Sequence, residues 1–289
     1  MKISVSSYSY AAYAKKNHAT YEQLCDIAKE QGFDGIEFID LDSPLFGYTG
    51  DMLPVARRIR EHCEKIGLQV VAYTVYANLL SDDMEAEMQR LRRRVDEAEA
   101  LGARVMRHDA CQAPRKLPRY HYTDAIREMT PYIRELTEYA RSKGIRTCTE
   151  NHGRYFQQAN RVEALIRAVN NDNYGWLVDV GNFMSVDADV ISSVKTGLPY
   201  AFHVHFKDNI FKPGTQVMPY GFRTTLHGNY LRSTVIGHGD VPVQQCVRML
   251  KDAGYDGFVT VEFEGWEDNL MAVEGGQKNL RLFAESVGY

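Results

Sequence analysis

The chain has 289 residues, 44% of them hydrophobic and 25% charged, which suits one α/β barrel, a fold that typically needs about 250 residues. Its formal net charge of −4 gives no general attraction for nucleic acid or for a membrane surface. The five cysteines are scattered and lack CxxC spacing, which argues against a disulfide framework or a thiolate zinc site. We therefore expect no nucleic-acid partner and no membrane partner. Because no apolar run near the N-terminus is long enough for a signal peptide, we also expect a cytoplasmic protein.

One pattern recurs along the chain: an amphipathic helix, then a glycine, then a short run rich in β-branched residues. The glycines fit the left-handed position that ends a helix, and they are Gly32, Gly67, Gly102, Gly144 and Gly254. Thr20 and Gln23 have the spacing of a capping box, which predicts a helix start at Thr20. Helix, glycine and strand in repetition are typical of parallel βα units.

These repeats predict eight strands joined by helices. We expect the strands at about 2–7, 34–40, 69–75, 103–108, 145–150, 175–179, 200–206 and 257–263. We expect the helices at about 20–31, 51–66, 83–101, 122–143, 160–170, 188–196, 241–253 and 267–286. Eight such units favour a closed (β/α)8 TIM barrel over an open doubly wound sheet. No linker or low-complexity segment interrupts them, so the sequence predicts a single domain over residues 1–289.

A long connection follows the seventh strand, at about residues 207–240. Connections of that length in a compact domain are usually functional or disordered. This one is rich in aromatic residues, arginine and histidine. We therefore expect an ordered loop beside the active site that helps to set specificity.

Polar side chains stand at the ends of four successive predicted strands: Glu150, Asp179, His205 and Glu262. In a barrel of this type the active site is built at the carboxyl ends of the strands. Alternate residues of a strand face the same side, so each of the four has a partner two residues earlier that lies one layer deeper in the barrel. Taken singly, each is more often a helix cap or an ion-pair partner, but together they predict one converging site.

Three carboxylates and one imidazole make a hard, oxygen-rich ligand set. Such a set predicts one divalent metal, with Mn²⁺ first and Mg²⁺, Co²⁺ or Zn²⁺ as alternatives. His203 is interpreted as a packed, hydrogen-bonded residue of the deeper layer. Glu264 lies past the strand end and is interpreted as a neighbour of the ligands or as a solvated residue.

The segments ENHG, DVGN, HVHFKD and GYDGFVTVE resemble motifs of the xylose isomerase-like TIM-barrel superfamily, over the whole chain. That superfamily includes sugar and sugar-phosphate isomerases and epimerases, inosose dehydratases and the endonuclease IV proteins. The resemblance implies a metal held by the four strand-end residues, with Glu150 and Glu262 also near the reacting carbon. It implies a small-molecule carbohydrate substrate, and because members are often dimeric or tetrameric, a homo-oligomer.

Three positions depart from the ketose 3-epimerase branch of that family. The substrate-contacting glutamate of that branch is matched by Phe156, its arginine by Phe211 and its histidine by Asn182. The extra metal-binding histidines of endonuclease IV are also missing from the sequence. The resemblance therefore keeps the metal site but gives no support for a ketose 3-epimerase or a DNA-repair enzyme.

Two enzymatic functions fit this ligand set. The first is a sugar isomerase or epimerase, in which Glu150 and Glu262 remove and return a proton through a metal-bound enediolate. The alternative is a lyase, such as a keto-inositol dehydratase or a 3-keto-C-glycoside deglycosidase subunit, which needs a further acid or base for the leaving group. His152 is the first candidate for that group because it follows Glu150 by two residues.

A third possibility is a partner subunit that keeps the barrel but does little chemistry, and the intact ligand set argues against it. Residues near the strand ends and in the long loop are expected to bind substrate: His108, Lys207, Asn182, Arg223, His238 and Trp266. Trp266 offers an aromatic face on which a sugar ring can lie.

Overall fold

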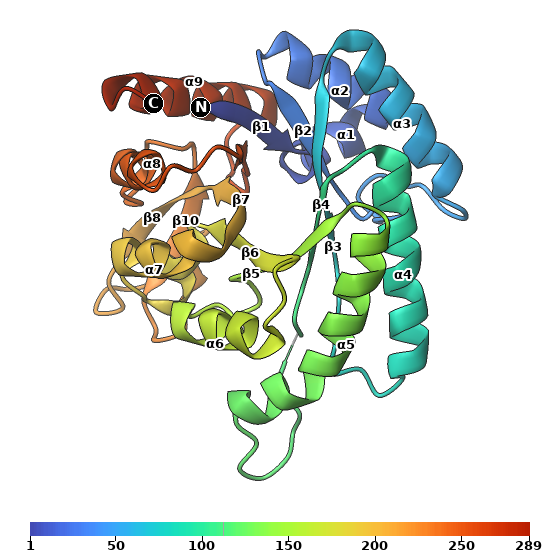
Figure 1. Ribbon diagram of the computed structural model, residues 1–289. Helices are drawn as coiled ribbons and strands as arrows, with labels where there is room; N and C mark the ends of the chain where they lie inside the picture. The colour runs from blue at the N-terminus through green and yellow to red at the C-terminus, as the bar shows by residue number, and fades with distance from the viewer. Residues whose placement is uncertain (112) are drawn as a thin grey trace.

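A closed barrel of parallel strands forms the centre of the computed structural model, which describes residues 1–111 and 113–289 (Figure 1). Around the barrel the strand order is β1-β11-β7-β6-β5-β4-β3-β2. The strands are β1 (Lys2–Ser6), β2 (Gly35–Ile39), β3 (Gln69–Val75), β4 (Val105–His108), β5 (Arg146–Glu150), β6 (Tyr174–Asp179), β7 (Ala201–Phe206) and β11 (Phe258–Val261). The predicted (β/α)8 barrel is confirmed, and each predicted strand overlaps one of these eight.

Helices surround the barrel on its outside (Figure 1). They are α1 (Ala11–Asn17), α2 (Tyr21–Glu30), α3 (Leu53–Ile66), α4 (Met84–Leu101), α5 (Tyr122–Ser142), α6 (Ala159–Val169), α7 (Val190–Gly197), α8 (Val243–Asp252) and α9 (Asn269–Ser286). Short 3-10 helices occupy Ser7–Tyr10, Asn182–Val186 and Leu198–Tyr200. The sequence pattern does not predict α1, because seven residues are too few to display a helical period.

Local sequence signals position the helix ends as predicted. The Thr20 side chain accepts from the Gln23 amide, and the Gln23 side chain accepts from the Thr20 amide, so the capping box is present. All five glycines of the repeat have φ between 67° and 80°. Such left-handed backbone costs a residue with a side chain more than it costs glycine, so these glycines reverse the chain from helix to strand.

The apolar core has two layers. The larger one lies between the outer face of the strands and the helices, and includes Trp176 and Phe38. The smaller one fills the inside of the barrel with Val71, Ala72, Val105, Cys148 and Leu177. Because this inner layer is packed, the open space for a site is left at one end of the barrel.

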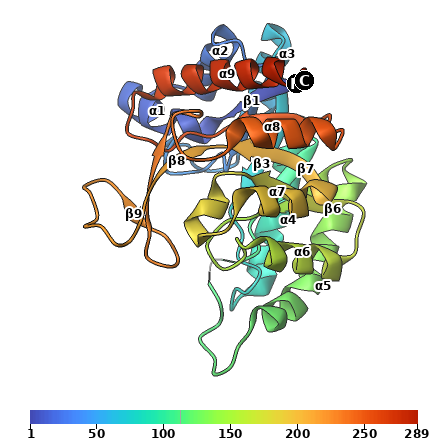
Figure 2. The same cartoon turned by 90° about the vertical axis from the view of Figure 1, so that its left-hand side faces the viewer.

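The long connection after β7 is ordered and forms a second, antiparallel sheet of β8 (Asp208–Lys212), β9 (Arg223–Thr224) and β10 (Tyr230–Thr234). Figure 2 shows its outer loops projecting from the body of the barrel. The buried carboxylate of Asp208 closes its base, because it accepts from the amides of Gly237, Gly239 and Val241 at 2.8–3.0 Å. This excursion therefore starts and ends at one fixed point beside β7.

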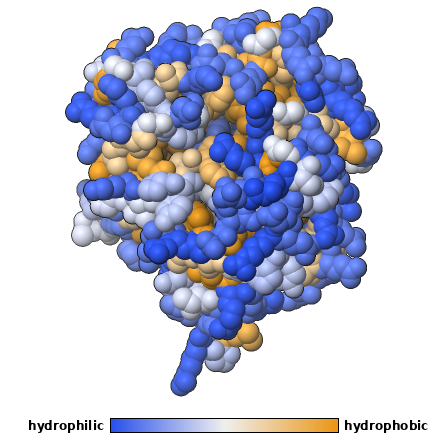
Figure 3. All heavy atoms as spheres, viewed as in Figure 1, coloured by the Kyte–Doolittle hydropathy of each residue, from blue (hydrophilic) through white to orange (hydrophobic). Residues whose placement is uncertain are grey.

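The outer surface is mainly hydrophilic on the face shown in Figure 3, where apolar residues lie in separate patches. Among the helices of the described residues, none combines the length and the apolar character needed to span a membrane.

Candidate metal and active site

Four side chains from successive barrel strands converge at one point. Glu150 ends β5, Asp179 ends β6, His205 lies in β7, and Glu262 follows β11. Each offers one ligand atom, and the four atoms all lie within 4.8 Å of one another. The set is buried apart from Glu262, whose side chain is 13% exposed. The four residues therefore form a candidate site for one ion, and the strand-end rule brings them together at this point.

A cavity of about 350 Å³ opens onto this cluster. Its walls are Tyr8, Ile39, Asp40, Thr74, Tyr76, Arg107, Asp109, Glu150, His152, His205, Lys207, Glu262 and Glu264. Small-molecule pockets range from about 300 to 1,000 Å³, so this one has the size for a single small ligand. All of these lining residues except Ile39 carry a polar side-chain group, which suits a ligand rich in hydroxyl groups.

Buried polar atoms face the centre of the cluster. Asp179 Oδ2 and Glu262 Oε2 are buried with the Lys207 ammonium as their ion-pair partner, and His205 Nδ1 is buried with Glu262 Oε2 3.7 Å away. Two carboxylate oxygens and an imidazole nitrogen that meet at one buried point are stabilised by a cation between them. Together with Glu150 they form an oxygen-rich set, so these residues fit a divalent cation.

Local structure fixes the outer oxygen of Asp179. Its Oδ1 accepts from the backbone amides of Gly181 and Asn182, each at 2.9 Å. Those amides begin the turn after β6, so the DVGN segment holds the carboxylate in place. The Asn182 side chain then donates to Glu150 Oε1 at 2.8 Å and links two of the ligands.

Lys207 reaches the cluster from the strand that carries His205. Its ammonium lies 3.2 Å from Asp179 Oδ2 and 3.0 Å from Glu264 Oε1, and it also pairs with Glu262. A Cβ at position 181 would lie 2.4 Å from the Lys207 side chain, so the glycine of DVGN leaves room for this lysine. These ion pairs outweigh the effect of burial, which would lower the pKa of Lys207, and hold it well above its usual value.

The carboxylates of the cluster are unequal in charge. Burial raises the pKa of Asp179 to about 7, against the opposing effect of Lys207. Burial also acts to raise the pKa of Glu262, but Lys207 and His205 outweigh it and lower that pKa well below the usual value. Asp179 is therefore the carboxylate whose charged form would gain most from a bound cation.

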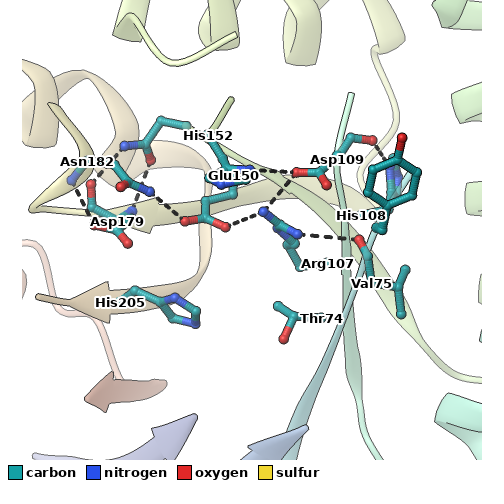
Figure 4. A network of polar contacts seen from close by, with 12 residues as sticks. Thr74, Val75, Arg107, His108, Asp109, Glu150, His152, Asp179, Asn182 and His205 are labelled. Atoms are coloured by element: carbon teal, nitrogen blue, oxygen red, sulfur yellow. Dashed lines mark hydrogen bonds and ion pairs between the residues drawn. The ribbon is translucent and has the colours of Figure 1, made fainter. Parts of the chain in front are cut away.

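A second polar network continues from Glu150 into the other wall (Figure 4). Arg107 at β4 pairs with Glu150 Oε2 at 2.6 Å and with Asp109 Oδ1 at 2.8 Å. The same Asp109 oxygen lies 3.0 Å from His152 Nδ1. Partial burial would lower the pKa of His152, but its bond to Asp109 raises it above the usual value. The network therefore links Arg107 through Asp109 to His152, whose side chain is 46% exposed at the cavity wall.

His152, predicted as an acid or base, and Lys207, predicted to bind substrate, both line the cavity. Asn182 lies behind the wall and contacts Glu150. His108 does not line the cavity: it is fully buried, and its ring stacks on Tyr174 at 5.8 Å. The cause is strand alternation, since Arg107 pairs with Thr74 and Cys148 on the inner side and His108 therefore points outward.

The other expected substrate contacts lie outside the cavity. Arg223 donates to Ser233 and Asn209 within the second sheet. His238 is exposed in the turn that Asp208 closes. Trp266 is 59% exposed and meets the Tyr220 ring edge-on at 5.3 Å. No described residue of 208–240 lines the cavity, so a role in substrate binding for this segment stays a prediction.

The departures from the ketose 3-epimerase pattern also have clear positions. Phe156 is buried against Tyr155, and Phe211 is 37% exposed on β8. Neither lines the cavity. The positions that would carry polar substrate contacts in that branch therefore face elsewhere here.

Several site residues escaped the sequence analysis. The opposite wall comes from the first four strands and the loops after them, and it includes Tyr8, Asp40, Thr74, Tyr76, Arg107 and Asp109. Glu37, in the middle of β2, lies beneath the cluster and contacts His203 and His205. The alternation of inner and outer residues along β4 would have identified Arg107, and the signal for Glu37 is that it is the one charged residue of the apolar strand GIEFI.

Comparisons with known proteins agree with this fold. An inosose isomerase of Halalkalibacterium halodurans is 27% identical over 133 residues, or 45% of this chain and 43% of that protein, so the match spans less than half of that relative. An L-ribulose 3-epimerase structure has a TM-score of 0.76 at 18% identity, with 100% of this chain and 96% of that chain covered. The probable 3-DHS dehydratase AsbF of Bacillus anthracis, involved in petrobactin synthesis, has a TM-score of 0.75 at 19% identity, with coverages of 97% and 99%.

At these identities the two structures show a shared fold. The family match is direct, because the sequence profile described as xylose isomerase-like TIM barrel aligns with residues 25–282. The resemblance seen in the ENHG, DVGN, HVHFKD and GYDGFVTVE segments is thereby confirmed, and the chain belongs to the xylose isomerase-like TIM-barrel family.

Proposed function

We propose that the chain is a divalent-metal-dependent isomerase or epimerase of a sugar or sugar derivative. The observation that carries this proposal is the convergence of Glu150, Asp179, His205 and Glu262 on one point that faces a small polar cavity. The inosose isomerase relative and the epimerase of similar fold support the reaction class.

The four residues named above would hold the ion, with Mn²⁺ as the first candidate. A bound divalent cation polarises a substrate carbonyl and stabilises negative charge on its oxygen. Asp179 acts only as a ligand, because its other oxygen is fixed by two backbone amides. His205 is likewise assigned as a ligand, because Glu37 holds one of its ring nitrogens and leaves the other for the ion.

Glu150 and Glu262 are assigned to proton transfer. Both line the cavity, and they come from strands that are not neighbours in the barrel, so a substrate held between them meets a carboxylate on two sides. Glu150 is fixed by Asn182 and Arg107, which aim its carboxylate. One glutamate removes a proton from the carbon beside the carbonyl and the other returns it, and this step typically contributes about 10²- to 10⁴-fold to the rate.

The alternative is a lyase that uses the same site, and one specific observation favours it. His152 lies on the cavity wall with Asp109 fixed behind it, so the site has a third acid or base. Elimination needs such a group to protonate the leaving group. The dehydratase of similar fold supports this alternative.

The substrate is assigned as unphosphorylated. A phosphoryl group carries about −1.5 to −2 charge at neutral pH and is usually bound by free arginine or lysine. In the described part of the chain, the arginine and lysine that line the cavity are Arg107 and Lys207, and each already contacts two or more carboxylates. An uncharged polyhydroxy carbonyl compound needs no further cation.

Metal analysis followed by a substrate screen tests the proposal. Purified protein, with Mn²⁺, Mg²⁺, Co²⁺ or Zn²⁺ added, is incubated with ketoses, keto-inositols, 3-keto-glycosides and their phosphates, with mass detection. A product of equal mass supports the isomerase or epimerase, and loss of water or an aglycone supports the lyase. A parent protein that binds no divalent ion and turns over no compound of the screen overturns both. The predicted homo-oligomer or partner subunit and the predicted cytoplasmic location stay predictions.

Glu150→Gln gives the matched mechanistic test. The amide keeps the size of the side chain and its bond to Asn182 but cannot take up a proton. Turnover is expected to fall by about 10²- to 10⁴-fold while substrate still binds. Full turnover in this variant removes Glu150 from the mechanism.

A further inference from the structure

A fully buried glutamate lies one layer beneath the proposed metal site. Glu37 stands in the middle of β2, on the side of the barrel opposite to the ligand strands, and its exposed fraction is 0%. Its Oε2 lies 2.8 Å from His205 Nε2 and 3.0 Å from His203 Nε2. One carboxylate oxygen thus faces the ring nitrogens of two histidines.

The rest of this layer leaves Glu37 little freedom. Its other oxygen lies 3.1 Å from the Thr74 hydroxyl, which shares its one proton with the Phe38 carbonyl at the same distance. His203 Nε2 is also 2.7 Å from the Thr260 hydroxyl, which is 2.7 Å from Ser4. A carboxylate held from both oxygens in a closed layer keeps one orientation, because any rotation would leave buried polar atoms without partners.

This arrangement decides which nitrogen of His205 carries a lone pair. A carboxylate can only accept hydrogen bonds, so His205 Nε2 must be protonated to bond with Glu37. His205 Nδ1 is buried, has no hydrogen-bond partner in the described residues, and lies 3.7 Å from Glu262 Oε2 on the side of the cluster. An imidazole binds a metal through its unprotonated nitrogen, and the bond made by the other nitrogen fixes the ring.

We propose that Glu37 is a positioning residue that fixes the ring of His205 and presents its Nδ1 lone pair to the metal. This inference rests on the metal site of the proposed function. Glu37, His203 and His205 also form a three-ligand group by distance alone. We assign that group to hydrogen bonding and not to a second ion, because its shortest contacts join two histidine nitrogens to one shared carboxylate oxygen.

Metal affinity of two variants tests the proposal. Glu37→Gln keeps the shape but loses the charge, and Glu37→Leu removes the acceptor altogether. Loss of such a partner usually weakens metal binding by 10- to 100-fold, so Kd for Zn²⁺, measured by chelator competition, should rise about 10-fold in the first variant and about 100-fold in the second. The visible spectrum of bound Co²⁺ should change in both, because it reports the ligand geometry.

Glu97→Gln is the matched control. Glu97 is also a buried glutamate, but it accepts from Tyr73 and Arg94 on the outside of the barrel. Its substitution should change stability while leaving Kd within about 2-fold, as expected for distant sites. A folded Glu37→Gln or Glu37→Leu protein with parental Kd and one parental Co²⁺ spectrum overturns the proposal, and so does binding of two Zn²⁺ ions by the parent.

A measurement on the parent protein keeps the test independent of folding in the variants. Nitrogen NMR of the Zn²⁺-loaded protein with ¹⁵N-labelled histidine should show one ring with a metal-bound Nδ1 and a protonated Nε2, assigned by its loss in His205→Ala. A metal-bound Nε2 with a protonated Nδ1 overturns the proposal. If the parent binds no metal at all, the proposed function fails instead, so the two failures are distinguishable.

Discussion

The two halves of the barrel contribute different things to one cavity. Strands β5, β6, β7 and β11 carry the four candidate ligands at or just beyond their carboxyl ends. Strands β2, β3 and β4 supply Glu37, Thr74 and Arg107, which contact those ligands or line the space above them. One half therefore provides the atoms that would bind the ion, and the other half helps to orient two of them, His205 and Glu150.

The difference has a physical origin. A ligand must offer a lone pair at the site. Asp179 Oδ2 faces the site with Lys207 as its ion-pair partner, and His205 Nδ1 faces it without a hydrogen bond among the described residues. A polar atom without a full set of hydrogen bonds is costly to bury, so the other polar atoms of the same side chain must be held by hydrogen bonds or ion pairs. For Asp179 the bonds come from its own turn, but for His205 and Glu150 they come across the barrel from Glu37 and Arg107.

The largest effect is expected for a ligand of the C-terminal half. Asp179→Asn places an amide where the cation needs a charged oxygen, so metal Kd should rise more than about 100-fold. A saturating metal at 100 times Kd stabilises the parent by about 2.7 kcal/mol, and thermal unfolding should show this gain in the parent and not in the variant. Asp187→Asn is the control, because Asp187 lies in the turn bonded to His227 and Asn229, away from the cluster.

The same substitution carries a prediction for the metal-free protein. Burial raises the pKa of Asp179 to about 7, so the stability that this carboxyl contributes is present below about pH 4 and lost as the pH rises through 7. At pH 8 the asparagine therefore removes the free-energy penalty of a buried charged carboxylate. The metal-free variant should unfold at the same temperature as the metal-free parent or at a higher one. A lower unfolding temperature would mean that Asp179 is mainly a structural residue.

The next largest effect is expected for His152 and Asp109, a hydrogen-bonded pair that joins the two halves of the barrel. His152→Gln removes the candidate acid or base while keeping a polar side chain, and Asp109→Asn weakens the bond that orients it. If the reaction is an elimination, both should lower product formation, the first by about 100-fold. If it is an isomerisation, exchange of the substrate proton with deuterated solvent should continue in both. Equal loss of exchange and of product would place His152 in the proton-transfer step itself.

A substitution in the N-terminal half is expected to lower turnover less than the preceding variants do and to lower stability more. Arg107→Met leaves Glu150 and Asp109 without their buried cation, and breaking such a pair typically costs about 3–5 kcal/mol. Turnover should fall by about 10-fold, because Glu150 keeps Asn182 but loses one of its two anchors. Urea unfolding with and without metal measures the stability.

Arg94→Met is the control for Arg107. Arg94 is equally buried and pairs with Asp40, Asp42 and Glu97, but it does not touch a candidate ligand. Arg94→Met should lower the free energy of unfolding about as much as Arg107→Met does, with a smaller loss of turnover. A parental unfolding free energy in Arg107→Met would show that the ion pairs of this wall contribute little.

The same division explains what the sequence could predict. The candidate ligands follow a rule that can be read locally: a polar residue at the end of a β-branched run faces the site when it lies on the inner face of the strand. The eight strands, the glycine-terminated helices and the four candidate ligand positions can be predicted in this way. Contacts across the barrel cannot: the run GIEFI shows that Glu37 is a charged residue in an apolar strand, but not that it contacts His205.

His108 shows that an error of one residue along a strand changes which side chain is predicted to face the site. Its predicted place at the end of the fourth strand is right, since β4 ends there. Its side chain nevertheless points outward, and Arg107 faces the cavity instead, because β4 pairs Arg107 with Thr74. A single-residue change in parity exchanges the two faces of a strand, so the end of a strand alone does not settle which residue enters the site.

The smallest effect is expected outside both halves, in the segment after β7. His238 is exposed and does not line the cavity, so His238→Ala should change the free energy of unfolding by no more than about 0.5 kcal/mol and leave KM unchanged.

Trp266→Ala tests more directly whether this segment binds substrate, because Trp266 lies against Gly221 and Tyr220 at its edge. With the segment fixed as seen here, KM in Trp266→Ala should stay parental. A KM that rises in this variant while kcat is unchanged would mean that the segment closes over bound substrate, and the cavity would then have a third contributor besides the two halves of the barrel.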